Sequence, residues 1–248
     1  MNRYNLMEAQ QRGAKVGCSG TINDLLINRM VTLDCHRRKR NLIVAWIDVR
    51  KAYDSIDHGW LKKIMHVHKL PIWICQVISK LCDSWNTSII ITTSKGSETS
   101  LPMYFNRGHL QGDALCPCLF TLCLNPVAWR LSSTEGYRLS KPIASKITNL
   151  LYVDDLKVFT ASKAKLKRVL EMAQTTIGDI GLQWNSKKCN RLHVRMGITL
   201  KDSEGYVMGT MSVDCLKKVL HYRFLGVPEE LLQDEKVVLE RAANTYLK

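Results

Sequence analysis

Two adjacent aspartates enclosed between apolar segments are the feature that most constrains the fold of this chain. Asp154 and Asp155 follow Tyr152-Val153, with Leu150-Leu151 before them and Val158-Phe159 after them. Such flanks predict a strand–turn–strand hairpin with the acidic pair at its tip. Two adjacent like charges repel, and a bound divalent cation is the usual compensation. The alternative is an exposed β-turn, but exposed turns are seldom enclosed between buried strands.

A third carboxylate ends a second apolar strand far upstream. Residues 42–47 form a continuous apolar run that is typical of a strand buried on both faces, and Asp48 follows it. A carboxylate in this position must be paired, bind a metal or cap the next helix. Together with Asp154 and Asp155 it can hold two Mg²⁺ ions for nucleotidyl transfer. For Asp54 we expect the simpler role of a helix N-cap.

The remaining chain mixes short strands and helices, which indicates an α+β fold. A first helix is expected from a capping box at residues 21–24 to the basic residues 37–40, with Ile22, Leu26 and Met30 at helical spacing. The other expected helices are 55–69, 71–81, 114–131 (broken near Pro117 and Pro126), 162–180 and 229–248. The other expected strands are a hairpin over 86–93 and 98–105, then 189–195 and 219–225.

Composition favours a polyanionic partner and an intracellular location. The 36 Lys and Arg residues outnumber the 22 Asp and Glu residues, for a formal net charge of +14. Nine cysteines, an odd number without a C-x-x-C pair, indicate a reducing compartment rather than a disulfide framework. There is no signal-peptide core and no apolar run long enough to cross a bilayer. We therefore expect a protein of the nucleus or cytoplasm that is neither secreted nor bound to a membrane.

Five motifs occur in an order that resembles one family. Asp48 is followed by an aromatic residue, Tyr53; residues 107–117 read R-G-H-L-Q-G-D-A-L-C-P, and residues 152–155 read Y-V-D-D. Residues 181–188 then read G-L-Q-W-N-S-K-K, and 224–226 read F-L-G. Over about residues 10–228 the chain resembles the reverse transcriptase domain of non-LTR (LINE-type) retrotransposons. The Gln-Gly-Asp loop favours this type over the group II intron and retroviral polymerases, which share the same palm.

The resemblance implies a polymerase palm, which is an antiparallel sheet backed by helices, with partial fingers and a truncated thumb. Residues 1–41 correspond to the partial fingers, 42–228 to the palm with an inserted fingers segment, and 229–248 to the start of the thumb or a tail. Only 47 residues precede Asp48, fewer than in the family. The strands whose basic residues grip the triphosphate are therefore expected to be missing.

The resemblance also implies a role for each matching residue. Asp48, Asp154 and Asp155, helped by the carbonyl of Val49, would hold two Mg²⁺ ions, with Mn²⁺ as an alternative. Tyr53 would exclude a ribose 2′-hydroxyl, and Lys188 would act as general acid or neutralise the phosphates. The implied contacts to template and nucleotide are Arg107, Gly108, Gln111, Gly112 and Asp113, and the implied primer grip is Phe224, Leu225 and Gly226.

The implied function is that of an RNA-directed DNA polymerase, which transfers nucleotides to a primer 3′-hydroxyl by two-metal chemistry. Its partners would be an RNA template, a DNA primer and dNTPs. The alternative is a catalytically inactive retroelement fragment that only binds nucleic acid, because missing fingers would abolish triphosphate binding. A third interpretation, a basic α+β domain with a solvated acidic turn, does not account for five ordered motifs.

Overall fold

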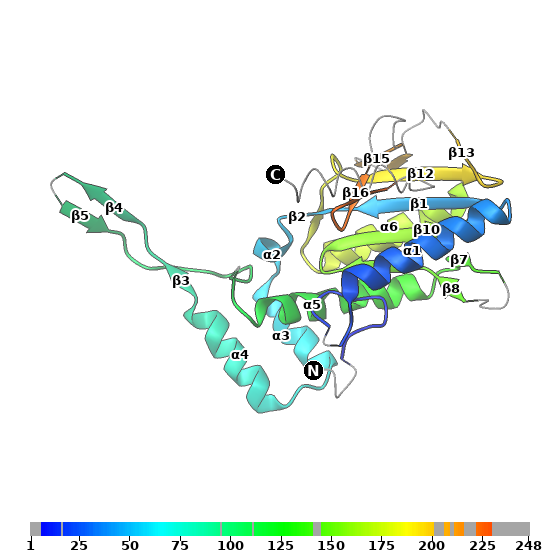
Figure 1. The fold of residues 1–248 in the computed structure, drawn as a ribbon. Helices are drawn as coiled ribbons and strands as arrows, with labels where there is room; N and C mark the ends of the chain where they lie inside the picture. Colours follow the sequence, from blue (N-terminus) through cyan, green and yellow to red (C-terminus); the bar gives the residue numbers. More distant parts are fainter. Residues whose placement is uncertain are drawn as a thin grey trace.

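The computed structural model describes residues 6–15, 17–94, 96–110, 112–140, 145–200, 206–208, 211–215 and 222–229. In this part of the chain the central sheet has seven strands, in the order β14-β15-β12-β1-β10-β9 with β13 paired to β12 (Figure 1). The strands are β1 (Leu42–Ile47), β9 (Asn149–Tyr152), β10 (Asp155–Thr160), β12 (Asn190–Arg195), β13 (Ile198–Thr199), β14 (Tyr206–Met208) and β15 (Met211–Cys215). All pairs are antiparallel except β12 with β15.

Strand β1 lies in the middle of the sheet and is buried on both faces, as its sequence predicts. Ile43, Ala45 and Ile47 pack into one apolar cluster with α5 (Cys116–Ser132) and α6 (Lys163–Asp179). The alternate residues of β1 pack into a second cluster with α1 (Gly20–Arg37). Side chains alternate across a strand, so one continuous apolar run supplies both clusters and fixes the layers of the fold.

The helix expected over 55–69 is α3 (His58–Val67), and a separate short helix, α2 (Ala52–Ser55), precedes it. Asp57 separates them, because its side chain accepts the backbone N–H of Trp60 at 2.9 Å and caps α3. The expected N-cap role of Asp54 is wrong, since Asp54 lies inside α2 and the N-cap of that helix is Lys51.

The break expected in the helix over 114–131 is also wrong. Helix α5 runs without interruption from Cys116 to Ser132 and contains Pro126. Pro117 lies in the first turn, where a backbone N–H has no intrahelical acceptor to lose. At Pro126 one helical hydrogen bond is missing, but the neighbouring Leu122, Cys123 and Val127 are fully buried in the first cluster and hold the helix in place.

Helix α1 reverses the expected pattern of burial. Ile22, Leu26 and Met30 are 61%, 54% and 40% exposed, whereas Asp24 and Asn28 are buried. The expected capping box is wrong too: Ser19 is the N-cap without a side-chain hydrogen bond, and Asp24 instead accepts Arg12 Nη1 at 2.8 Å. Burial raises the pKa of Asp24 to about 6, against the opposing effect of Arg12.

An arm extends away from the sheet (Figure 1). It consists of α4 (Ile72–Ser84) and the paired strands β3 (Asn86–Thr87), β4 (Ile90–Thr93), β5 (Gly96–Thr99) and β6 (Met103–Tyr104). The predicted hairpin is therefore confirmed. Every residue of its four strands is exposed, including Ile90 and Tyr104, so the arm contributes little to the core.

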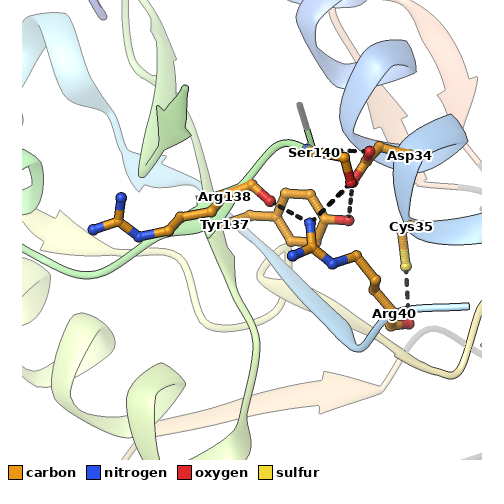
Figure 2. Close-up of polar contacts among 6 residues, drawn as sticks. All are labelled: Asp34, Cys35, Arg40, Tyr137, Arg138 and Ser140. Carbon is orange, nitrogen blue, oxygen red and sulfur yellow. Dashed lines mark hydrogen bonds and ion pairs between the residues drawn. The ribbon is translucent and has the colours of Figure 1, made fainter. Parts of the chain in front are cut away.

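A polar cluster ties the end of α1 to the hairpin of β7 (Tyr137–Arg138) and β8 (Lys146–Ile147), as Figure 2 shows. Asp34 accepts the Tyr137 hydroxyl at 2.7 Å and the Ser140 backbone N–H at 3.2 Å, and Arg40 Nη1 lies 3.3 Å from the same carboxylate. Burial opposes ionisation of Asp34, but these hydrogen bonds outweigh it and lower its pKa. The cluster is satisfied internally, which indicates a structural role.

The remaining expectations concern disulfide bonds, membrane spans and two segments of the chain. The eight cysteines whose side chains are described form no disulfide bonds. Among the described helices, none combines the length and apolar character that a bilayer crossing requires. Gln111 and the helix expected beyond residue 229 lie outside the described residues.

Candidate active site

Asp48 and Asp155 lie beside each other because of the register between β1 and β10. Ile47 pairs with Leu156 in an antiparallel register. Asp48, which follows β1, and Asp155, the first residue of β10, therefore lie at the same end of these two strands. Beyond Asp48 the chain continues into β2 (Val49–Arg50), which pairs with β11 (Gln183–Trp184). The carbonyl of Asp48 accepts the backbone N–H of Asn185 at 2.8 Å. The loop after β11 is thereby fixed next to the end of β1.

The predicted acidic hairpin is confirmed, and its turn is tight. Tyr152 at the end of β9 pairs with Asp155 at the start of β10, so that only Val153 and Asp154 form the loop. Val153 has a φ of 56°, in the left-handed region that two-residue hairpin loops use and that glycine normally occupies. A β-branched residue is strained there. Strain of this kind persists only where the surrounding structure enforces it.

The three carboxylates influence one another electrostatically. Burial, together with the charges of Asp154 and Asp48, raises the pKa of Asp155 to about 6. The pKa of Asp154 is also raised, mainly by burial and in part by Asp48. Lys188 opposes both shifts, and its Nζ lies 3.9 Å from Asp48 Oδ1. Folding has therefore concentrated negative charge that a cation would relieve.

The chemistry of these donors fits Mg²⁺. All three side chains offer hard carboxylate oxygens, the ligand type that Mg²⁺ prefers. Among the described residues, no three His, Cys, Asp or Glu side chains already converge closely enough to enclose a metal ion. The site is thus a row of neighbouring donors rather than a closed cage. That arrangement suits Mg²⁺, because the ion is commonly bound by one or two carboxylates together with substrate phosphates and water.

Tyr53 lies next to the acidic hairpin. Its ring stacks on Phe120 of α5, with centroids 4.5 Å apart and planes inclined by 17°. Burial raises the pKa of Tyr53, and the charge of Asp154 adds to the shift. The stacking partner fixes the ring and leaves it partly exposed beside the carboxylates. The backbone carbonyl of Tyr53 also accepts the N–H of His109 at 2.9 Å, which joins it to the next motif.

Hydrogen bonds attach the loop that starts at Arg107 to the segment after Asp48. The backbone N–H of Gly108 donates to Ile56 at 2.7 Å, and His58 Nε2 lies 2.8 Å from the Gly108 carbonyl oxygen. Gly108 has a φ of +87°, and a Cβ there would lie 2.9 Å from the backbone of Asp54, so only glycine fits. Arg107 and Gly112 are exposed. Asp113 accepts the N–H of Leu115 at 2.7 Å just before α5, but the N-cap of that helix is Leu115, so Asp113 does not cap it.

The predicted primer grip is the turn between β16 (Tyr222–Phe224) and β17 (Val227–Glu229). Leu225 and Gly226 both have positive φ, at 51° and 81°, which is typical of a type I′ hairpin loop. The Phe224 side chain points inward: it is 1% exposed, and its ring centroid lies 4.9 Å from Lys157 Nζ. Phe224 therefore anchors the turn, while Leu225 and Gly226 form its outer part.

Two residues that contact this region lie outside the predicted site residues. Gln11 hydrogen-bonds to the turn of the acidic hairpin, and Lys157 lies buried under Phe224. Gln11 lies in a polar stretch between Gln10 and Arg12, and Lys157 interrupts an apolar strand. No local pattern distinguishes either from a surface residue, so only the folded chain identifies them.

Comparison with known proteins defines the class of this fold and site. The family model described as "Reverse transcriptase (RNA-dependent DNA polymerase)" matches residues 1–228. The chain therefore belongs to the reverse transcriptase family, and the resemblance to its non-LTR retrotransposon branch is confirmed.

Individual relatives are Pol polyproteins of R2 retrotransposable elements. The chain is 24% identical over 232 residues to that of Nasonia vitripennis and 24% identical over 225 residues to that of Drosophila melanogaster. A Popillia japonica R2 polyprotein is 30% identical over 227 residues. These matches cover 92%, 89% and 89% of this chain but 22%, 20% and 31% of the relatives. The chain thus spans a fifth to a third of their length.

Solved structures with the same fold include telomerases of Candida tropicalis. One, in complex with a TWJ fragment of telomeric RNA, has a TM-score of 0.54 at 14% identity and covers 83% of this chain and 32% of the telomerase. An apo form truncated from the C-terminal domain has a TM-score of 0.52 at 16% identity, covering 84% of this chain and 40% of the telomerase. The predicted polymerase palm, a mixed helix and antiparallel sheet fold, is confirmed.

Proposed function

We propose that this chain catalyses RNA-directed DNA synthesis, adding deoxynucleotides to a primer 3′-hydroxyl on an RNA template. One observation carries the proposal. The pairing of β1 with β10 brings Asp48 beside the tip of the acidic hairpin, where its charge raises the pKa of both Asp154 and Asp155. Three such carboxylates in a family of RNA-dependent DNA polymerases support nucleotidyl transfer.

Asp48, Asp154 and Asp155, with the backbone carbonyl of Val49, are the proposed ligands of two Mg²⁺ ions, for which Mn²⁺ is an alternative. The chemistry that such ions supply when bound is activation of the attacking hydroxyl and neutralisation of the triphosphate charge. The protein contributes the fixed position of its carboxylates, since Asp48 directly follows the paired strand β1, Asp154 lies in a two-residue turn and Asp155 begins the paired strand β10.

Lys188 is the proposed general acid, or the group that neutralises phosphate charge. It fits this role because its side chain is 68% exposed and its Nζ lies 3.9 Å from Asp48 Oδ1, close to the carboxylates yet open to a ligand. Tyr53 is the proposed steric gate against a ribose 2′-hydroxyl, and its stacking on Phe120 keeps the ring beside the hairpin.

The remaining proposed contacts involve one loop and one turn. Template and nucleotide would lie along the loop from Arg107 to Asp113, which includes Gly108, Gln111 and Gly112. The primer would lie against the turn that includes Leu225 and Gly226, with Phe224 as its anchor. We also propose the division into partial fingers (1–41), palm (42–228) and the start of a thumb (229–248), and action in the nucleus or cytoplasm.

Primer extension tests the function directly. The purified chain, an RNA template annealed to a DNA primer, dNTPs and Mg²⁺ should yield extended primer. Asp154→Asn should reduce the rate by about a hundredfold or more, because it removes an oxyanion that holds the metal. Asp179→Asn is the matched control, since that carboxylate is 63% exposed at the end of α6, and it should retain full activity.

The opposite result identifies the alternative function. A wild-type chain that binds template–primer but incorporates no nucleotide would be a nucleic-acid-binding fragment. Its affinity should then fall steeply between two salt concentrations, as binding through phosphate contacts does. Asp154→Asn should leave that binding unchanged.

A further inference from the structure

Gln11 precedes Val153 by 142 residues in the sequence, yet its side chain hydrogen-bonds to both the backbone N–H and the backbone carbonyl of Val153. Gln11 Oε1 accepts the Val153 N–H at 3.0 Å, and Gln11 Nε2 donates to the Val153 carbonyl at 3.2 Å. The same Oε1 also accepts the N–H of Gly13 at 2.9 Å. Gln11 is 0% exposed. One buried carboxamide therefore satisfies both polar groups of the residue that forms the first half of the hairpin turn.

The neighbouring backbone aims this side chain at the turn. Leu151 in β9 donates its N–H to Gln10 at 3.1 Å and accepts the N–H of Arg12 at 2.9 Å, in a parallel bridge between Gln11 and Leu151. Residues 10–12 thus extend the sheet by one short strand at the edge beside β9. Because hydrogen bonds flank Gln11 on both sides, its side chain has little freedom to leave the turn.

The segment is packed tightly against the turn as well. A Cβ at Gly13 would lie 2.6 Å from both the backbone nitrogen and Cγ2 of Val153, closer than real Cβ atoms come. Val153 itself adopts a φ of 56°, which a β-branched residue adopts only when its surroundings impose it. Relaxing the turn would leave the buried carboxamide and the Val153 backbone without partners, and buried polar groups resist that loss.

We propose that Gln11 is a positioning residue, which holds the strained turn at Val153 and thereby fixes the direction of Asp154 and Asp155. The inference rests on the proposed function for what the aspartates do, but the hold on the turn can be measured independently. Gln11 does not contact the reacting atoms; it acts through Val153.

The test compares Gln11→Met with Gln10→Met in the full chain. Methionine keeps the volume of glutamine but makes no amide hydrogen bonds. Gln10 is the matched control, because its buried Oε1 has no hydrogen-bond partner in the described part of the chain. In Gln11→Met the Val153 amide should exchange with solvent about tenfold faster, as expected for a lost hydrogen bond. Gln10→Met should leave that exchange rate unchanged.

The second readout is the rate of single-nucleotide addition. Gln11→Met should lower kcat by about a hundredfold, since small misplacement of reacting groups has effects of that size. KM for dNTP and the dissociation constant for template–primer should stay within about twofold. Adding Val153→Gly should restore much of kcat, because glycine adopts the left-handed conformation without enforcement. A role confined to stability predicts no such rescue.

Each outcome decides the proposal. Equal amide exchange in the two variants, an unchanged kcat, or a loss of kcat that Val153→Gly does not relieve would overturn it. If the wild-type chain extends no primer, the proposed function fails. The positioning role of Gln11 is then tested by the affinity of each variant for Mn²⁺. Weaker Mn²⁺ binding in Gln11→Met than in Gln10→Met supports the positioning role, and equal binding refutes it. If Gln11→Met alone does not fold, the same comparisons are made in the Val153→Gly background.

Discussion

At the scale of single residues, the acidic hairpin combines two unfavourable features. Val153 lies in the left-handed region of φ, and Asp155 is half-buried beside two other carboxylates. Neither arrangement stabilises the metal-free fold. Such features are commonly found at active sites, where function requires a geometry that stability alone would not select. The hairpin should therefore be a place where removing charge stabilises the protein and abolishes activity.

Asp155→Asn tests this relation through its dependence on pH. The folded-state pKa of Asp155 is raised from 3.8 to about 6. The carboxyl therefore contributes stability below about pH 4, and that contribution is lost as pH rises through about 6. At pH 7 in EDTA the asparagine variant should be more stable than wild type by about 1–2 kcal/mol. Denaturant unfolding at pH 4 and pH 7 measures the difference.

Binding of Mg²⁺ should reverse the order of stability of wild type and Asp155→Asn. Mg²⁺ should raise the unfolding free energy of wild type at pH 7 and have little effect on Asp155→Asn, because the variant has lost a ligand. The exposed Asp179 provides the control, since Asp179→Asn should unfold like wild type at both pH values. A metal-free Asp155→Asn that is less stable than wild type at pH 7 would show that the carboxylate is paired rather than repelled.

At the scale of elements, α1 departs most from its sequence pattern. Helical periodicity assigns the apolar residues to the core, yet the face of α1 that meets the sheet carries Asp24 and Asn28. The reason is Lys157, an inward-facing residue of β10 whose Nζ donates to Asn28 Oδ1 at 2.6 Å. A buried ammonium needs polar partners. The polar face of α1 supplies them, and its apolar stripe is left exposed.

A pair of substitutions in α1 distinguishes the two faces. Leu26→Lys should change the unfolding free energy by less than about 0.5 kcal/mol, because Leu26 is 54% exposed. Asn28→Leu should lower the unfolding free energy by about 2–4 kcal/mol, because the substitution removes an acceptor of the buried Lys157 amino group. This loss is expected even though leucine is more apolar than asparagine. Urea unfolding at neutral pH provides both values. If Leu26→Lys lowers the unfolding free energy more than Asn28→Leu does, the apolar periodicity of the sequence identifies the buried face of α1, and this account of the helix is wrong.

Elements with a strong and simple pattern could be predicted. The six apolar residues of β1, the acidic hairpin and α6 all appear where the sequence places them. Prediction failed where a long-range contact decides the structure. Pro126 remains inside α5 because buried neighbours hold the helix, and the segment around Gln11 pairs with β9 without any strand pattern. Neither effect is encoded within a few residues.

At the scale of the whole molecule, the site joins segments that are far apart in sequence. Asp48 and Asp155 meet through the pairing of β1 with β10, and Lys188 reaches Asp48 through the loop after β11. The ordered motifs predict that these residues act together, because all of them fall in motifs that resemble those of one family. The motifs could not predict that Phe224 points inward over Lys157, since that depends on how β16 packs against the sheet.

Asp48, Asp154 and Asp155 are proposed to act as one nucleotidyl-transfer centre. Non-additivity of rates for single-nucleotide primer extension tests it most directly, because residues that act as a unit are not additive. Asp48→Asn and Asp154→Asn should each reduce the Mg²⁺-dependent rate by about a hundredfold or more, and the double variant should be no slower than the slower single variant. Full activity in Asp48→Asn, or losses that multiply in the double variant, would contradict the claim.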